Sequence, residues 1–198
     1  IVISTLPLSI TARFLGKKNN LKFRGVCSVY LFYNENYILD KNIHWLYFDS
    51  DKVLFNRITE NKKLSRFVAP KGKSFLTLET TYTLGDKFSK LKPNEVMKLM
   101  IEQINSTNLV NKEKFIGSQI NYEPFVYPVQ FHDYKSEIAN VKSHVENFNN
   151  LFSIGASGEF NYADSQILFH KSFDLVNSLT NKFGTDINET KNYRYDNL

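Results

Sequence analysis

Polar and apolar residues alternate along several short stretches in the first half of the chain. Residues 23–33 form a long run of β-branched and aromatic residues, and residues 74–82 alternate between polar and apolar types. Residues 43–48 and 53–60 carry the same pattern over shorter lengths, and the turn-forming Pro-Lys-Gly-Lys of residues 70–73 separates two of these stretches. Four strands joined by turns rather than by helices predict an antiparallel sheet.

Helical spacing takes over further along the chain. Pro93 stands where a helix would begin, and apolar residues follow it with helical spacing: Val96, Met97, Met100, Ile101 and Ile104. A strand pattern returns at residues 115–122, and Pro124 and Pro128 bracket a further extended stretch. Asp133 can cap a second helix, whose apolar face would be formed by Ile138, Val141, Val145 and Phe148.

The chain opens with Ile1-Val2-Ile3, an apolar β-branched run that predicts a buried strand. A short helix is expected over residues 8–15, where Gly16 would end it. Buried strands seldom begin a free chain, because their neighbours must come from elsewhere. We therefore expect the sequence to be part of a longer one.

A second short buried strand is expected over residues 151–154, and it runs into Gly155 and Gly158. A last amphipathic helix is expected from about residue 162 to 179, and the polar, aperiodic residues beyond Lys182 are expected to be frayed. Glycines between a strand and a helix let the backbone approach a ligand closely and point a helix N-terminus at negative charge. A plain tight turn between the two elements is the alternative.

Composition narrows the classes of function. Hydrophobic residues make up 42% of the chain and aromatic residues 15%, which is enough for a real core. The net charge of +5 comes from lysines spread along the chain, so nucleic-acid binding is not expected. No apolar run approaches the roughly 20 residues of a membrane span. The single cysteine, Cys27, excludes an internal disulfide and suits a reducing compartment, so a cytoplasmic location is expected.

Motifs for common catalytic sites are absent from the sequence. The four histidines have no metal-ligand spacing, so no metal site is expected. Neither a G-x-S-x-G nucleophile motif nor a P-loop is present. No catalytic residue is therefore assigned.

Six segments occur in a characteristic order along the chain. They are residues 2–8 (VISTLPL), 23–26 (FRGV), 44–48 (HWLYF), 55–60 (FNRITE), 126–129 (VYPV) and 150–166 (NLFSIGASGEFNYADSQ). Over roughly residues 1–180 this series resembles the C-terminal half of FAD-dependent amine-oxidase-like flavoproteins. The resemblance is greatest to the branch that holds protoporphyrinogen-oxidase-like and UDP-galactopyranose-mutase-like proteins.

The resemblance implies an α+β fold with a mostly antiparallel substrate-domain sheet, flanking helices and a strand–helix remnant of a doubly wound FAD domain. Residues 1–8 would return the chain to the flavin domain, and residues 9–150 would form the substrate-side domain. Residues 151–180 would supply the last strand and helix of the flavin domain, and residues 181–198 a polar tail. The G-x-G-x-x-G unit that holds the FAD pyrophosphate in such proteins is absent from this sequence.

The resemblance also implies site residues. The residues expected against the FAD are Gly155, Ala156, Asp164, Ser165 and Gln166, and those expected to face the substrate are Arg57, Tyr127 and Tyr162. Plainer readings stay open: Arg57 as a surface charge, Tyr127 as a core or rim aromatic, and Asp164 as a helix cap. The family commonly has Arg at the position of Ala156, and the mutase-like branch Tyr at that of Ala163. Both departures weaken anion recognition and count against mutase activity.

The function implied is that of an FAD-dependent oxidoreductase in the intact protein, with this chain inactive by itself. Its expected partners are the N-terminal FAD-binding part of the same protein and a small-molecule or sugar-nucleotide substrate. FAD is expected in the intact protein and not in this chain. The alternatives are a flavin-dependent sugar-nucleotide isomerase of the UDP-galactopyranose mutase type and a non-catalytic binding remnant.

Overall fold

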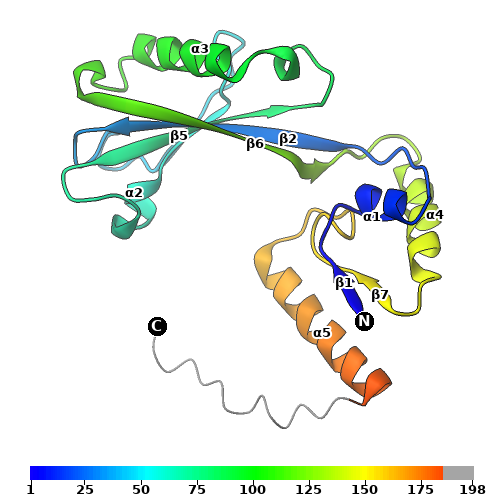
Figure 1. The fold of residues 1–198 in the computed structure, drawn as a ribbon. Helices are drawn as coiled ribbons and strands as arrows, with labels where there is room; N and C mark the ends of the chain where they lie inside the picture. Colours follow the sequence, from blue (N-terminus) through cyan, green and yellow to red (C-terminus); the bar gives the residue numbers. More distant parts are fainter. Residues whose placement is uncertain (185–198) are drawn as a thin grey trace. The chain divides into compact units, whose positions relative to one another are not determined.

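The computed structural model of the chain describes residues 1–184, which form two compact units (Figure 1). The sheet unit comprises Phe23–Val129, and the terminal unit comprises Ile1–Lys22 together with the residues from Gln130 onward. Residues 9–22 and 130–150, expected with the sheet, cluster instead with the terminal strands. The cause is local packing, because α1 (Leu8–Phe14) packs against α4 (Tyr134–Glu146).

The sheet unit is built on a five-stranded sheet in the order β3-β4-β5-β2-β6, and every pair of neighbouring strands is antiparallel. The strands are β2 (Phe23–Tyr33), β3 (Trp45–Tyr47), β4 (Arg57–Glu60), β5 (Ser74–Tyr82) and β6 (Phe115–Pro128). The helices are α2 (Asn61–Leu64), α3 (Pro93–Ser106) and the 3-10 turns η1 (Arg66–Val68), η2 (Phe88–Lys90) and η3 (Lys112–Lys114). The predicted α+β class and the antiparallel sheet are confirmed.

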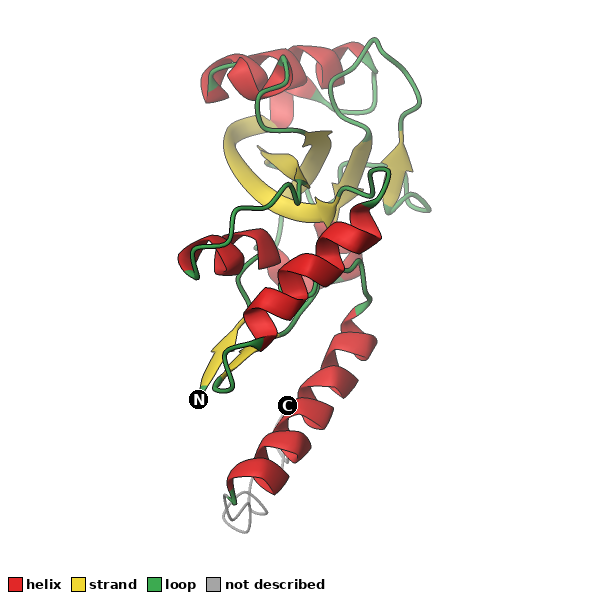
Figure 2. Cartoon of the chain, turned by 90° about the vertical axis from the view of Figure 1, so that its right-hand side faces the viewer, coloured by secondary structure: helices red, strands yellow, loops and turns green. Residues whose placement is uncertain are grey.

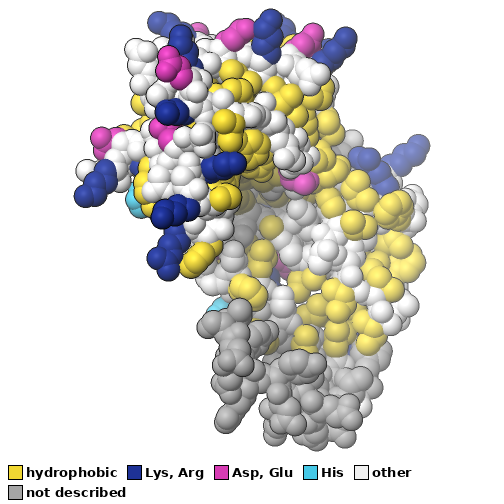
Figure 3. Space-filling view, turned by 60° about the vertical axis from the view of Figure 1, so that its left-hand side comes forward, with side chains coloured by type: hydrophobic (Ala, Val, Ile, Leu, Met, Phe, Trp, Pro, Cys, Tyr) yellow, Lys and Arg dark blue, Asp and Glu magenta, His cyan; other side chains and the backbone are white. Residues whose placement is uncertain are grey.

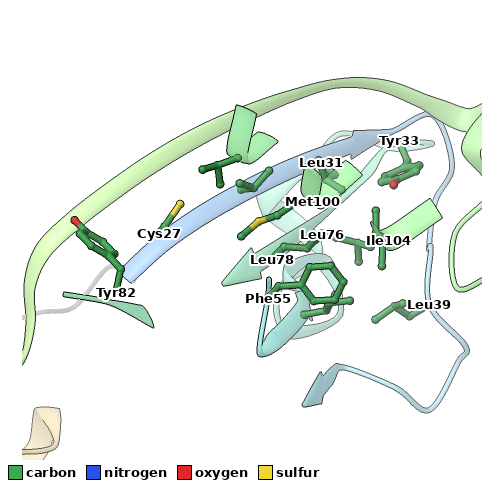
Figure 4. Close-up of a cluster of buried hydrophobic side chains, with 13 residues drawn as sticks. Cys27, Leu31, Tyr33, Leu39, Phe55, Leu76, Leu78, Tyr82, Met100 and Ile104 are labelled. Atoms are coloured by element: carbon green, nitrogen blue, oxygen red, sulfur yellow. The ribbon is translucent and has the colours of Figure 1, made fainter. Parts of the chain in front are cut away.

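The core of the sheet unit lies between one face of the sheet and α3 (Figure 4). Every second residue of β2, including Val29 and Leu31, is fully buried on this face, whereas the residues between them are partly exposed. Met100 and Ile104 of α3 pack onto the same cluster and are also fully buried. This alternation is why residues 23–33 and 74–82 form strands over the predicted lengths.

Three strand predictions differ from the structure in length. The strands expected over residues 43–48 and 53–60 shrink to Trp45–Tyr47 and Arg57–Glu60. The strand expected over residues 115–122 instead continues to Pro128, past a register shift between Arg24 and Val26 on β2. Pro124 is tolerated within β6 because this strand lies at the edge of the sheet and the irregularity falls beside it.

The terminal unit holds a parallel pair of short strands, β1 (Val2–Ser4) and β7 (Leu151–Ser153), seen side by side near the N-terminus in Figure 2. Its longest helix is α5 (Ser165–Phe183). The predicted burial of the first strand is wrong, since Val2 and Ile3 are 53% and 49% exposed. A strand with a single neighbour keeps much of its side-chain surface open.

The predicted side-chain cap of α4 is also wrong. Asp133 occupies the N-cap position with a left-handed φ of 65°, but its carboxylate makes no capping bond and lies 2.7 Å from His132 Nδ1. The polar tail from residue 185 onward lies outside the described residues. Among residues 1–184, no helix combines the length and apolar character that crossing a bilayer requires.

Candidate functional site

Two glycines shape the turn that follows β7 in the terminal unit, each for a different reason. Gly155 has a φ of +95°, in the left-handed region that glycine favours, and a Cβ built on it would meet no atom within 4 Å. A Cβ on Gly158 would lie 2.3 Å from the carbonyl oxygen of Ile154. The turn therefore needs glycine for conformation at Gly155 and for close backbone approach at Gly158.

The carbonyl groups of this turn are engaged within the chain. Backbone N–H groups donate to Gly155 O (from Glu159, 2.9 Å), Ala156 O (from Asn161, 2.8 Å) and Ser157 O (from Leu8, 3.0 Å), and Ser153 Oγ donates to Gly158 O at 2.8 Å. The backbone N–H groups of Gly155, Ala156 and Gly158 find no acceptor among residues 1–184. Gly155 and Ala156 are partly exposed, whereas Gly158 is buried. The N–H groups of Gly155 and Ala156 are therefore the ones that could meet a carbonyl or anionic oxygen of a ligand.

The start of α5 offers a second set of donors. Asp164 occupies the N-cap position, but its side chain makes no capping bond, so the plain helix-cap reading of this carboxylate is wrong. Its carbonyl accepts from the N–H groups of Ile167 (3.1 Å) and Leu168 (3.2 Å). The backbone N–H groups of Ser165 and Gln166 have no acceptor within the described part of the chain. Asp164, Ser165 and Gln166 are exposed at the positive end of the helix.

A flavin nucleotide, expected from the resemblance, would need donors of this kind on one side. The turn and the start of α5 lie in the same unit. A cavity of about 310 Å³ in this unit is lined by Leu8, Val145, Phe152 and Leu175, beside an ion pair in which Lys171 Nζ lies 2.5 Å from Glu159 Oε2. Because the sequence contains no glycine-rich dinucleotide fingerprint, the residues present could approach the cofactor but not hold its pyrophosphate.

The second candidate site is the face of the sheet opposite α3. The strand register places five polar side chains in one row across the five strands, in the order Tyr47, Arg57, Glu79, Ser28 and Asn121. The next row consists of Trp45, Thr59, Thr77, Tyr30 and Gln119. Hydroxyl, amide and charged groups beside aromatic rings can recognise a small polar ligand. We call this surface the open face.

Arg57 is a paired charge on the open face. Its Nε donates to Glu79 Oε2 at 2.5 Å, and its guanidinium carbon lies 6.0 Å from the centre of the Tyr47 ring. The hydrogen bond to Glu79 raises the pKa of Arg57 further above its ordinary value, which keeps the guanidinium positive. With 37% of its side chain exposed, Arg57 is a paired cation that a ligand could still reach.

The three residues expected to face a substrate do not form one cluster. Arg57 lies on β4 and Tyr127 near the end of β6, three strands away in the sheet. Tyr127 pairs with Arg24 and the row of Arg57 contains Ser28, so strand spacings put Arg57 and Tyr127 about 20 Å apart. Tyr162 belongs to the terminal unit, where it is 70% exposed.

Sequence reasoning found Arg57 but missed its row neighbours Glu79, Ser28 and Asn121. Each occupies an outward position of an alternating strand, which is the signal that could have selected them. Cys27 is buried on the opposite face. Among residues 1–184, no group of three or more His, Cys, Asp or Glu side chains could hold a metal ion.

The fold of the chain has matches among known structures, although its sequence matches no family model and no curated protein. A structure of reduced UDP-galactopyranose mutase matches with a TM-score of 0.76 and 17% identity, over 93% of this chain and 42% of that chain. A protein of Exiguobacterium sp. 255-15 described as a protoporphyrinogen oxidase matches with a TM-score of 0.61 and 13% identity, over 79% of this chain and 36% of that chain.

The chain therefore spans less than half the length of either protein. At these identities the likeness concerns the fold alone. The resemblance expected from the six ordered segments is confirmed at that level: the chain has the fold of a portion of UDP-galactopyranose-mutase-like and protoporphyrinogen-oxidase-like flavoproteins.

Proposed function

We propose that the chain is the substrate-side and C-terminal portion of an FAD-dependent oxidoreductase of the amine-oxidase-like type, inactive by itself. The observation that carries the proposal is the match of one flavoenzyme structure over 93% of the chain, which includes both units. A cytoplasmic location, consistent with a single buried thiol at Cys27, is part of the proposal.

The terminal unit would contribute the FAD contacts. Gly155 and Ala156 would present backbone N–H groups to the cofactor, and Asp164, Ser165 and Gln166 would place the positive end of α5 beside it. An N-terminal part of the same protein would hold the pyrophosphate. When bound, FAD would accept a hydride from a substrate C–H bond, such as the one beside an amine nitrogen. The role of this chain is to orient the two reactants and exclude water.

The open face would contribute the substrate contacts. Arg57, oriented by Glu79 and Tyr47, supplies a fixed positive charge for a negatively polarised group of the substrate. Tyr127 and Tyr162 remain proposed substrate contacts. Because Tyr127 lies about 20 Å from Arg57 on the sheet, it would contact a different part of the ligand.

A flavin-dependent sugar-nucleotide isomerase is the second candidate, because the mutase structure matches with the higher TM-score of the two. By the resemblance, the family commonly has Arg at the position of Ala156 and the mutase-like branch Tyr at that of Ala163, and both departures argue against this activity. A non-catalytic remnant that keeps the fold and binds a ligand is the third candidate.

Flavin content of the intact protein is the first test. An intact protein that folds but purifies without flavin, and takes up none, would leave only the non-catalytic remnant. If flavin is present, the enzyme is incubated anaerobically with candidate amines and other reduced substrates. Substrate-dependent loss of the oxidised flavin absorbance supports the oxidoreductase. Conversion of UDP-galactopyranose by the chemically reduced protein, without net redox change, would support the isomerase instead.

A further inference from the structure

The segment of residues 61–73 (NKKLSRFVAPKGK) carries one sign of charge only. It contains five cationic residues, Lys62, Lys63, Arg66, Lys71 and Lys73, and no acidic residue. In the structure it forms α2, η1 and the turn that leads into β5, all within the sheet unit. We call it the basic segment.

Large apolar side chains project from the middle of the basic segment. Phe67 is 83% exposed, and Leu64 and Val68 are 60% and 49% exposed. Phe67 is the most exposed large hydrophobic side chain of the sheet unit. The guanidinium carbon of Arg66 lies 4.9 Å from the centre of its ring. Three neighbouring apolar side chains held in water are unfavourable unless a second surface covers them.

Two lysines of the basic segment, Lys62 and Lys63, hold it in place through hydrogen bonds. Lys62, which is 5% exposed, donates from Nζ to Asn36 Oδ1 (2.9 Å), Pro70 O (2.9 Å) and Lys73 O (2.6 Å). Lys63 Nζ donates to Leu39 O (2.8 Å), Ile43 O (2.8 Å) and Asp40 O, and lies 3.4 Å from the buried Glu60 carboxylate. These bonds tie the start of the segment to the loop of residues 36–43 and to the segment's own end at Pro70 and Lys73, so the apolar side chains between them are held in place.

The remaining cations surround the apolar side chains. Arg66, Lys71 and Lys73 are exposed, and so is Lys41 on the adjoining loop, where Asp40 is the exposed acidic neighbour. A cavity of about 610 Å³ beside the segment is lined by Tyr37, Lys41, His44 and Arg66 together with Lys62 and Lys63. In Figure 3, Lys and Arg side chains gather on this part of the sheet unit with hydrophobic side chains between them.

We propose that the basic segment seats the protein on the surface of an anionic lipid bilayer. Leu64, Phe67 and Val68 would enter the boundary between headgroups and acyl chains, while Arg66, Lys71 and Lys73 remain at the level of the phosphates. The cavity next to Arg66 would take one anionic headgroup. The protein would lie on the membrane without spanning it.

Charge and shape together favour a bilayer over other acidic partners. An acidic polymer satisfies the cations but leaves the three apolar side chains in water. A bilayer supplies a plane of negative charge directly above an apolar phase, which matches the order of side chains on the segment. Apolar insertion and a basic patch each bind a membrane weakly, and the two together attach a protein to it reversibly.

Cosedimentation with lipid vesicles tests the proposal. The purified intact protein is mixed with vesicles of equal parts phosphatidylcholine and phosphatidylserine, or of phosphatidylcholine alone. Binding is expected only to the anionic vesicles and should weaken as salt is added. The double variant Lys71→Gln/Lys73→Gln should lose about fivefold in affinity per charge removed. The variant Phe67→Ser should bind the anionic vesicles with about tenfold lower affinity, because the apolar side chain that inserts into the bilayer is gone.

Matched variants on the same unit separate this site from general stickiness. Leu84→Ser removes another side chain that is 63% exposed, and Lys90→Gln/Lys98→Gln removes two exposed charges elsewhere; both should bind like the parent chain. All substituted side chains are exposed, so circular dichroism and thermal unfolding should confirm that every variant is folded. Three results would overturn the proposal. They are no binding to anionic vesicles, equal loss in the matched variants, or binding to polyglutamate that is as tight as to vesicles and insensitive to Phe67→Ser.

Discussion

Arg57 and Glu79 lie opposite each other on β4 and β5, and the 2.5 Å bond from Arg57 Nε to the Glu79 carboxylate fixes the direction of the guanidinium. The pair sits in the middle of a row that runs from Tyr47 to Asn121 across the sheet. A charge held in this way can recognise a ligand without first being ordered, which lowers the entropic cost of binding.

Substituting Glu79→Gln should affect substrate binding more than stability. The Arg57 side chain is 37% exposed, so the pair should contribute less than about 1 kcal/mol to the free energy of unfolding. In the intact enzyme the Michaelis constant should rise several-fold with little change in kcat, because a ground-state contact is misplaced. Glu102→Gln, in an exposed pair with Lys98 on α3, is the control. An unchanged Michaelis constant would make Arg57 an ordinary surface charge.

The thiol of Cys27 should make the native state sensitive to alkali. Burial raises its pKa from an ordinary 9.0 to about 11, and the hydroxyl of Tyr122, its neighbour on β6, opposes part of the rise. Because the native pKa lies above the unfolded value, this contribution is complete below pH 9 and is lost between about pH 9 and 11. The loss should be about 2–3 kcal/mol.

Urea unfolding at several pH values between neutrality and pH 11 measures this effect. The variant Cys27→Ala removes the thiol, so its unfolding free energy should fall less steeply over that range than that of the parent. Burial also raises the pKa values of Tyr82 and Tyr122, so some slope should remain in both proteins. Identical slopes would show that the thiol is not linked to folding.

The chain by itself should bind no FAD. Its donors at Gly155, Ala156 and the start of α5 approach one side of a flavin, but the sequence has no fingerprint to hold the pyrophosphate. The purified chain should be colourless, and titration into FAD should give no saturable change in flavin fluorescence. A yellow preparation with stoichiometric flavin would contradict this expectation.

Removal of the tail should leave the fold intact. Residues 185–198 carry no apolar period, and α5 already ends at Gly184, whose left-handed φ of 66° is typical of a helix C-terminus. Truncation after Gly184 should change the free energy of unfolding by no more than about 0.5 kcal/mol. A large loss in thermal stability would show that Tyr193 or Tyr195 contacts the folded part.

The sequence predicted the elements whose pattern is set by one buried face. Residues 23–33 and 74–82 alternate because one side of each strand packs beneath α3, and Pro93 marks a helix start through its own backbone chemistry. The short strands β3 and β4 were predicted too long, because strand-forming residues such as Ile43 and Phe55 also occur in loops that fill the core.

The open face was harder to predict from the sequence, because its rows of side chains depend on the register of the strands. Alternation shows that Glu79 and Asn121 point away from the core, but only the pairing of strands places them in the row of Arg57. The turn at Gly155 and Gly158 was easier to predict from the sequence, because both glycines are required by contacts and backbone angles within a few residues of the chain.

Gly155→Val in the intact protein should remove the flavin without unfolding the sheet unit. The φ of +95° strains any β-branched residue by about 1–3 kcal/mol, although the space around the Cβ is open. In the proposed complex that open space is the cofactor's approach, so the valine side chain would exclude FAD as well as strain the turn.

Gly16→Val is the matched control, because Gly16 lies in the same unit with a φ of +80° and no atom within 4 Å of its Cβ. Both variants should lose similar stability through the same backbone strain. Only Gly155→Val should lower the flavin bound per folded molecule, measured as flavin absorbance divided by the folded fraction from circular dichroism. If flavin per folded molecule is the same in both variants, the turn is a plain strand-to-helix connection. The FAD contacts proposed for Gly155 and Ala156 must then be withdrawn, while the fold assignment stands.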